Sequence, residues 1–223
     1  MSAELSQGPR TSSLSAADID EAAQRISDVV LRSELQYSER LSEATGANVY
    51  LKREDQQTVR SYKLRGAHNL LMQLSPEEVA AGVVCSSAGN HAQGFAMACR
   101  SMGIRGRVYV PGKTPKQKRD RIRYHGREFI ELIVTGHTYD EAAAAALDDI
   151  ARTGATLVPP YDDLRTIAGQ GTIAAEILEQ LDDEPDLVIV PVGGGGCIAG
   201  ITTYLAERTA NTSVLGVEPA GAA

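Results

Sequence analysis

The chain has 223 residues, of which 43% are hydrophobic and 23% are charged, as in ordinary globular proteins and unlike disordered ones. Its net charge of −7 argues against a surface that binds nucleic acid or anionic membranes. No apolar stretch approaches the roughly 20 residues that span a bilayer, and residues 1–13 lack the apolar block of a signal peptide, so we expect a cytoplasmic protein with no membrane segment.

Local signals predict the first elements of the chain. Residues 1–13 are polar, and we expect no regular structure there. Ser15, followed by Asp18 three residues later, forms a capping box, and the apolar residues after it recur at helical spacing. A second, short helix should end at Gly46 and be followed by a strand over 47–53.

Further along, helices and strands alternate. We expect helices between Ser75 and Gly82 and over 91–102, 115–124, 138–152, 164–181 and 197–208, and strands over 83–85, 107–110, 128–134, 155–158, 187–192 and 214–217. This alternation predicts an α/β fold with parallel sheets and helices on both faces. The basic run Lys113–Arg123 has helical spacing, and we interpret it as a solvated helix face.

The sequence offers no recognisable metal site. Cys85, Cys99 and Cys197 are too few and too scattered for a disulfide framework or a zinc site, and the four histidines show no ligand spacing. We therefore expect reduced thiols and no structural metal.

One lysine occupies an unusual position. A polar loop over 54–60 leads into residues 61–67, where Ser61 is placed to cap a helix and Lys63 lies just inside its first turn. The positive helix terminus disfavours a cation there, so its field should lower the pKa of Lys63 and make the amine a better nucleophile. The position alone would also suit a lysine that extends into solvent. Two glycine-rich turns further along favour the reactive role.

The first turn covers residues 86–94, between a predicted strand and a predicted helix. In open parallel sheets, ligands bind at such turns. Its small residues let the backbone approach a ligand, its amides suit a carboxylate, and Asn90 can donate a hydrogen bond to an oxygen. A purely structural turn with asparagine in a left-handed conformation is the alternative.

The second turn is Gly193, Gly194, Gly195 and Gly196, before the helix that begins at Cys197. Four successive glycines weaken any regular element, which is easiest to explain if the backbone wraps closely around an anion such as phosphate. The turn lacks the Lys-Ser/Thr ending of a P-loop and the spacing of the dinucleotide fingerprint, which argues against a nucleoside triphosphate or NAD.

A lysine nucleophile, an asparagine on a turn and a phosphate cradle together suit a cofactor with an aldehyde, a ring oxygen and a phosphate, and pyridoxal phosphate has all three. Here the sequence resembles the fold-type-II pyridoxal-phosphate enzymes, and among them the biosynthetic threonine dehydratases (threonine ammonia-lyases). The matching stretches are 51–55, 61–67, 87–94, 167–172 and 191–196, and they run in family order.

The resemblance implies a role for each matching residue. Lys63 would bind the cofactor covalently and act as the catalytic base, Asn90 would contact the ring oxygen, and the amides of the second turn would hold the phosphate. The cofactor-binding residues would be Lys63, Asn90, Gly193, Gly194, Gly195, Gly196 and Cys197, and the substrate-binding residues Ser87, Ala88, Gly89, Asn90 and His91. Relatives commonly have leucine at the position of Cys197, but a contact through the amide should tolerate the change.

The implied reaction is the elimination of water from L-threonine, and more slowly from L-serine, to 2-oxobutyrate or pyruvate and ammonia, as the first step of isoleucine synthesis. Related racemases often have serine, a second acid/base, at the position of Ala88, so alanine favours elimination. The alternatives are a serine dehydratase or racemase, and a threonine-synthase-like enzyme, whose motif usually reads Lys-Asp-Arg-Gly where this chain has Lys-Leu-Arg-Gly. A non-catalytic anion-binding module is the alternative from another class.

The resemblance also implies an architecture of the tryptophan-synthase-β type, in which a smaller domain interrupts a large one and the cofactor lies between them. We expect the large domain over 1–62 and 155–223 and the small domain over 63–154. Relatives form homo-oligomers, often tetramers, so we expect the same here, with a small amino acid as substrate. In relatives the rest of the large domain follows the last strand, so we expect a C-terminally truncated fragment, prone to aggregation and inactive by itself.

Overall fold

The computed structural model describes residues 13–221; the polar segment before Ser13 and the last two residues lie outside the described residues. The helices are α1 Ala16–Ile26, α2 Glu39–Thr45, α3 Lys63–Leu71, α4 Pro76–Ala81, α5 Asn90–Met102, α6 Lys116–Gly126, α7 Tyr139–Thr153, α8 Leu164–Gln180 and α9 Gly196–Arg208. The strands are β1 Leu35–Tyr37, β2 Tyr50–Lys52, β3 Val83–Ser86, β4 Gly106–Val110, β5 Ile130–Val134, β6 Thr156–Leu157, β7 Leu187–Pro191 and β8 Ser213–Val217. Short 3₁₀ helices cover Glu54–Gln56 and Arg127–Phe129.

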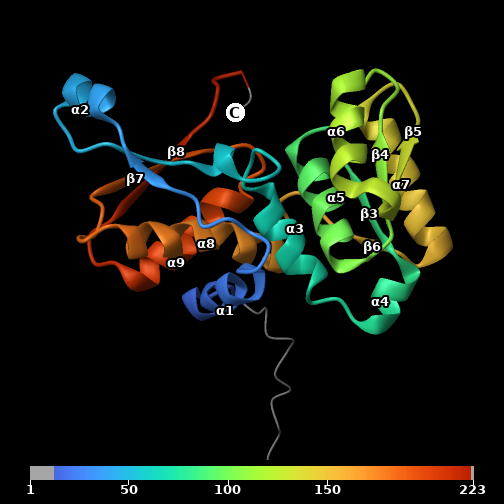
Figure 1. Ribbon diagram of the computed structural model, residues 1–223, viewed down its shortest axis with the longest axis horizontal. Coiled ribbons are helices and arrows are strands. Elements are labelled where there is room, and N and C mark those ends of the chain that lie inside the picture. Colours follow the sequence, from blue (N-terminus) through green and yellow to red (C-terminus); the bar gives the residue numbers. More distant parts are fainter. Residues whose placement is uncertain (1–12, 222–223) are drawn as a thin grey trace, which may run out of the picture.

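A four-stranded parallel sheet with the order β5-β4-β3-β6 forms one half of the molecule, on the right in Figure 1. Side chains alternate across its strands. Val83 and Cys85 join the core that includes α5, whereas Val84 and Tyr109 pack against Ala146 of α7 on the opposite face. The predicted parallel sheet with helices on both faces is confirmed in this half.

The other half contains the two-stranded parallel sheet β7-β8, which packs on α9, and α9 in turn packs on α8 and α1. Val190 and Ile201 lie in this second core. On the outer face of the sheet Ile189 is 61% exposed and Leu215 49%. Among the described residues, helices therefore cover only one face of this sheet.

Helix α3 lies between the two halves (Figure 1). The side chains of Leu64, Ala67, Leu70 and Leu71 are buried in the core shared with α5. Its other side packs on α8, so α3 contacts both halves of the molecule.

Several local predictions are confirmed and one strand is not as predicted. Ser15 and Asp18 form the expected capping box of α1, and Gly46 ends α2 in the left-handed conformation. The strand expected over 47–53 is wrong in extent: only β2 is a strand, and it pairs antiparallel with β1, which we did not predict. Three-residue strands are too short to show a period of two, so the sequence pattern could not locate their ends.

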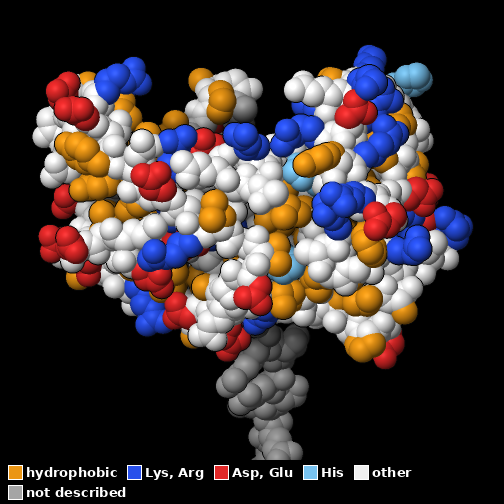
Figure 2. All heavy atoms as spheres, viewed as in Figure 1, with side chains coloured by type: hydrophobic (Ala, Val, Ile, Leu, Met, Phe, Trp, Pro, Cys, Tyr) orange, Lys and Arg blue, Asp and Glu red, His pale blue; other side chains and the backbone are white. Residues whose placement is uncertain are grey.

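Most of the basic run, from Lys116 onward, lies on α6, and Figure 2 shows Lys and Arg side chains gathered over this helix. Ile122 is its buried anchor, so the prediction of a solvated helix face is confirmed. The three cysteines are unpaired, with Cys85 and Cys99 buried. Within residues 13–221, no helix combines the length and the apolar character needed to cross a membrane.

Candidate active site

Three helices that begin at the predicted site, α3, α5 and α9, have no side-chain cap. By contrast, the side chains of Ser15, Ser75, Thr138 and Asp163 cap α1, α4, α7 and α8, while α2 and α6 also lack such a bond. The first backbone amides of an uncapped helix have no intrahelical acceptor, and they carry the positive end of the helix dipole. The starts of α3, α5 and α9 can therefore bind anionic or carbonyl oxygens.

Lys63 is the first residue of α3 and is partly buried. Its Nζ donates a hydrogen bond to the carbonyl oxygen of Pro160 at 2.7 Å, and it lies 5.1 Å from the centre of the Tyr62 ring. Burial lowers the pKa of Lys63 below its ordinary value, because desolvation disfavours the charged amine. The pKa is lower, as predicted, but the cause is burial and not the helix terminus on which the prediction rested.

The predicted cap of α3 is wrong. Tyr62, and not Ser61, occupies the N-cap position, and its backbone is helical instead of extended. A capping side chain needs the extended backbone of an N-cap residue to turn back onto the helix amides. Ser61 Oγ is buried without a hydrogen-bond partner among the described residues.

Gly94 of α5 brings that helix into contact with the backbone of Lys63. A Cβ atom at residue 94 would lie 2.8 Å from Leu64 N and from Lys63 C, closer than real Cβ atoms approach their neighbours. Only glycine therefore permits this crossing of α3 and α5. It places the first turn of α5, which begins at Asn90, beside Lys63.

His91 follows Asn90 and is 3% exposed. Its Nε2 lies 2.8 Å from the carbonyl oxygen of Val158. A carbonyl only accepts, so we assign the ring proton to Nε2. Burial lowers the pKa of His91 to about 4, and the nearby charge of Lys63 adds to the effect, so the ring is neutral near pH 7.

In the turn before α5, a hydrogen bond from the backbone holds the side chain of Ser87, and the space beside Gly89 is open. Ser87 Oγ accepts a hydrogen bond from the amide of Gly89 at 3.2 Å, which shapes the turn. Asn90 is exposed, and a Cβ added to Gly89 would meet nothing within 4 Å. The backbone of this turn is therefore accessible to a ligand.

The glycine turn needs its glycines for two reasons. Gly195 has φ +83°, a conformation that other residues adopt only with strain. Gly194 and Gly196 pack against Tyr161, where a Cβ on Gly194 would overlap the ring and one on Gly196 would lie 2.7 Å from the Tyr161 carbonyl oxygen. Beside Gly193 and Gly195, by contrast, a Cβ would meet nothing within 4 Å. The turn is thus supported on one side and open on the other.

Tyr62 and Cys197 connect the start of α3 to the start of α9. Burial raises the pKa of each to about 12. The neighbouring Cys197 adds to the rise in the pKa of Tyr62, whereas the neighbouring Tyr62 opposes the rise in the pKa of Cys197. Both are therefore neutral near pH 7. The hydrogen bond from Lys63 to Pro160, whose neighbour Tyr161 packs against Gly194 and Gly196, places the lysine near the glycine turn.

Sequence reasoning missed Pro160 and Tyr161. They follow β6, so they leave the four-stranded sheet at the same carboxyl edge as the turn after β3. The signal was available, because the predicted strand 155–158 is followed directly by Pro159 and Pro160, and ligand-binding residues gather at this edge.

The residues present fit pyridoxal phosphate. A partly buried amine with a lowered pKa stands at Lys63, the open side of Gly193 and Gly195 adjoins the uncapped start of α9, and the amide side chain of Asn90 is exposed nearby. An amine, a set of free backbone amides and a side-chain amide match an aldehyde, a phosphate and a ring oxygen. Their individual roles stay predictions.

The chain has close relatives among known proteins. The family model described as "Pyridoxal-phosphate dependent enzyme" matches residues 26–223. The biosynthetic L-threonine dehydratase of Mycobacterium tuberculosis is 79% identical over 100% of this chain and 53% of that protein. Among solved structures, threonine deaminase isoform 2 of Solanum lycopersicum has a TM-score of 0.88 with 44% identity, covering 93% of this chain and 59% of that one. Maize serine racemase has a TM-score of 0.89 with 31% identity, covering 94% and 63%.

The chain spans about half the length of the curated relatives that it matches. The predicted fold class is confirmed by the parallel sheets and by these structural neighbours, and the predicted resemblance and cofactor are confirmed by the family match. The chain therefore belongs to the family of pyridoxal-phosphate-dependent enzymes.

Proposed function

We propose that the chain is the cofactor-binding part of an ammonia-lyase that eliminates water from L-threonine, and more slowly from L-serine, to give 2-oxobutyrate or pyruvate and ammonia. In the cell this would be the first step of isoleucine synthesis. The observation that carries the proposal is the placement of the Lys63 amine between the uncapped starts of α5 and α9. The 79% identity to a biosynthetic L-threonine dehydratase supports this substrate.

Lys63, Asn90 and the amides from Gly193 to Cys197 would hold pyridoxal phosphate. When bound, the cofactor supplies an electron-accepting ring for the charge that develops at the α-carbon of the substrate. The open side of the glycine turn leaves room for the phosphate, and the positive end of α9 favours its charge.

Lys63 would accept the α-proton of the substrate at Nζ. A base must be unprotonated to act, and burial lowers the pKa of Lys63, which raises the neutral fraction near pH 7. The carbonyl oxygen of Pro160 lies 2.7 Å from Nζ and accepts a hydrogen bond from it, so it would hold the amine in place once it carries the proton.

The turn over 87–91 would bind the substrate carboxylate through its amides at the uncapped start of α5. Ala88 has no side-chain atom that exchanges a proton. The site would then have one base, on one face of the substrate, which favours elimination over racemisation. The number of bases in the site therefore distinguishes the proposed ammonia-lyase from the alternative of a serine racemase.

We also propose the predicted division into a large domain of residues 1–62 and 155–223 and a small domain of residues 63–154. The separate sheets support it, since β3, β4 and β5 fall in the small domain and β7 and β8 in the large one. Strand β6, at Thr156–Leu157, does not fit the boundary at residue 155, because it pairs with β3 of the small domain. This pairing favours a return of the chain to the large domain after Leu157. A proteolysis time course that cuts first within β4 or β5 would contradict this division.

We further propose a cytoplasmic homo-oligomer, as the resemblance implies, with a tetramer as the expected assembly. Light scattering of the purified protein measures the assembly, and a monomer at working concentrations would contradict it.

The test of the function is Lys63→Ala, with Lys113→Ala as its control. Both side chains are amines, but Lys113 is exposed on the loop before α6. Measured in the full-length enzyme of which this chain is the cofactor-binding part, Lys63→Ala should lose the visible absorbance of the lysine-bound cofactor and all threonine turnover, whereas Lys113→Ala should keep both. Borohydride reduction followed by peptide mapping should label Lys63; a label on Lys52 or Lys113 instead would end the assignment.

A further inference from the structure

Arg65, two residues after Lys63, is 0% exposed. A guanidinium has five N–H donors, and in Arg65 each of them donates a hydrogen bond. Nε and Nη2 donate to the two oxygens of Glu54 at 2.9 and 2.7 Å, and Nη1 and Nη2 to those of Glu176 at 2.7 and 3.0 Å. Nη1 also donates to Thr172 Oγ1 at 2.9 Å. All of its hydrogen bonds form together only in this one orientation of the side chain.

The charges around Arg65 balance. Glu176 also pairs with Lys52, whose Nζ lies 2.6 Å from Oε2, so two cations face two carboxylates. Burial by itself would lower the pKa of Arg65, but the hydrogen bonds to Glu54 and Glu176 outweigh it and raise the pKa. The same ion pairs hold the pKa of Glu176 below its usual range in spite of burial.

These partners supply what the first turn of α3 lacks. The turn has no side-chain cap and no acidic residue, and it carries Lys63 and Arg65, two cations at the positive end of the helix. Without a cap, and with two cations at the positive end of the helix dipole, the residues of this turn do not by themselves favour a helix start. Glu54, from the 3₁₀ helix, and Glu176, from α8, bring negative charge to it from outside. The start of α3 is therefore held by tertiary contacts.

The contact with α8 is tight beside Arg65. A Cβ on Gly169 would lie 2.6 Å from the Arg65 carbonyl oxygen and from Gly66 Cα, so only glycine permits this crossing. The segment that leads into α8 contains Pro160, whose carbonyl oxygen accepts the hydrogen bond from Lys63 Nζ. Fixing α3 on α8 thus fixes both ends of that bond.

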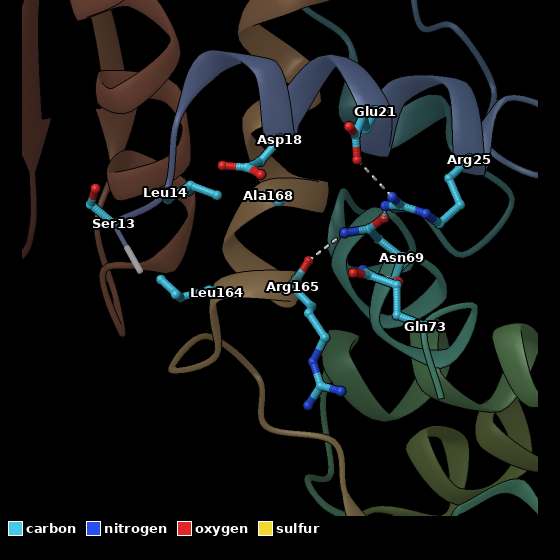
Figure 3. A pocket seen from close by; sticks show the side chains of 10 residues that line it. All are labelled: Ser13, Leu14, Asp18, Glu21, Arg25, Asn69, Gln73, Leu164, Arg165 and Ala168. Atoms are coloured by element: carbon cyan, nitrogen blue, oxygen red, sulfur yellow. Dashed lines mark hydrogen bonds and ion pairs between the residues drawn. The ribbon is translucent and has the colours of Figure 1, made fainter. Parts of the chain in front are cut away.

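One turn further along, Asn69 adds a second link on the same side of α3. Figure 3 shows it between Arg25 of α1 and Arg165 of α8, beside a cavity of about 170 Å³. Arg25 donates to Asn69 Oδ1 at 2.6 Å, and Asn69 Nδ2 donates to the Arg165 carbonyl oxygen at 2.6 Å. This link lies farther from Lys63, so it holds the middle of α3.

We propose that Arg65 is a positioning residue, which, through its ion pairs with Glu54 and Glu176, fixes the first turn of α3 so that the Lys63 amine faces the Pro160 carbonyl and the glycine turn. The inference rests on the proposed role of Lys63. It adds a requirement to that role, because the reactive lysine then depends on a buried charge cluster built from Arg65, Glu54, Glu176 and Lys52.

The test is Arg65→Lys, which keeps a cation but loses the two-pronged geometry that matches two carboxylates. Arg107→Lys is the matched control, because Arg107 also pairs with a buried carboxylate, that of Asp149, but on β4 and α7. The main readout is acylation of Lys63 by acetic anhydride over a pH series, in the protein without cofactor or substrate, quantified by peptide mass spectrometry. Lys113, which is exposed, is the internal reference for the reagent.

In Arg65→Lys the pH midpoint of Lys63 acylation should rise, because a loosened first turn exposes the amine to water. In the cofactor-loaded full-length enzyme kcat should fall about 10- to 100-fold, as expected for a misplaced catalytic group. Arg107→Lys should lower Tm but leave the midpoint and kcat as in wild type. A lower Tm for Arg65→Lys with an unchanged midpoint would overturn the proposal and leave Arg65 a purely structural residue.

If Arg65→Lys does not fold, Glu176→Gln takes its place, because it keeps the side-chain volume and removes one carboxylate of the cluster. The same rise of the midpoint supports the proposal, and an unchanged midpoint in folded Glu176→Gln overturns it. Since acylation needs neither cofactor nor turnover, this outcome does not depend on whether Lys63 binds the cofactor, and the Lys63→Ala experiment decides that question separately.

Discussion

Gly94→Ala places a methyl group between α5 and the backbone that carries Lys63. The new Cβ would lie 2.8 Å from Leu64 N, about 0.6 Å short of an ordinary contact of 3.4 Å. The atoms it meets are backbone, which cannot rotate away as a side chain can. The two helices must therefore separate, and Lys63 must move with α3.

Two opposing terms set the effect on stability. Alanine is favoured over glycine inside a helix by about 1 kcal/mol, whereas overpacking a core costs about 1–3 kcal/mol. The free energy of unfolding should fall by about 0–2 kcal/mol, which for a chain of this size lowers Tm by a few degrees. A shift of Lys63 by about half an ångström should cost more in activity, about 10- to 100-fold in kcat.

The assay is threonine turnover by the full-length enzyme, with Tm measured on the same protein, and Gly171→Ala is the control. Gly171 is also a helix glycine in a tight crossing, where a Cβ would lie 2.7 Å from Ile19 Cδ1 and 3.0 Å from the Gly200 carbonyl oxygen, but its neighbours do not include Lys63. Gly171→Ala should lose stability and keep kcat once folded. If Gly94→Ala keeps wild-type kcat, the close crossing of α3 and α5 does not position Lys63 and the reasoning is refuted.

Two further predictions concern the substrate and pH. Threonine and serine differ by one methyl group, worth about 1–3 kcal/mol in an apolar pocket, so both should react, with the higher kcat/KM for threonine; a strong preference for serine would contradict the assignment to isoleucine synthesis. The pKa of His91 is about 4 in the fold against an ordinary 6.5, so below pH 6.5 the unfolded chain binds a proton that the folded chain does not. Its contribution to stability, up to about 3 kcal/mol, is fully present above pH 6.5 and is lost as pH falls to about 4. Tm measured over this window should fall less steeply in His91→Gln than in wild type, and equal slopes would show that His91 is not buried as a neutral ring.

Much of the fold follows from short-range signals. The capping box at Ser15, the helix start at Ser75 and the helix end at Gly46 were predicted from residues within a few positions of one another, and the structure confirms them. The alternation of helices and strands is equally local and was sufficient for the fold class. The location of the candidate site could be predicted from the sequence for a related reason. In a parallel sheet the carboxyl ends of the strands share one edge, so turns far apart in the sequence are expected to meet there.

By itself the sequence predicted the helices and most of the strands, and it indicated the turns at which we propose the chemistry. Only the tertiary structure decided the pairing of β1 with β2, the strand order β5-β4-β3-β6, and the packing of α3. It also decided the surroundings of Lys63, whose Nζ bonds to Pro160, 97 residues away, while Arg65 pairs with Glu176, 111 residues away. No periodicity or capping pattern links such distant residues. They meet because the apolar faces of α3, α5 and α8 are buried together, and a buried arginine then requires carboxylates from whichever elements lie beside it.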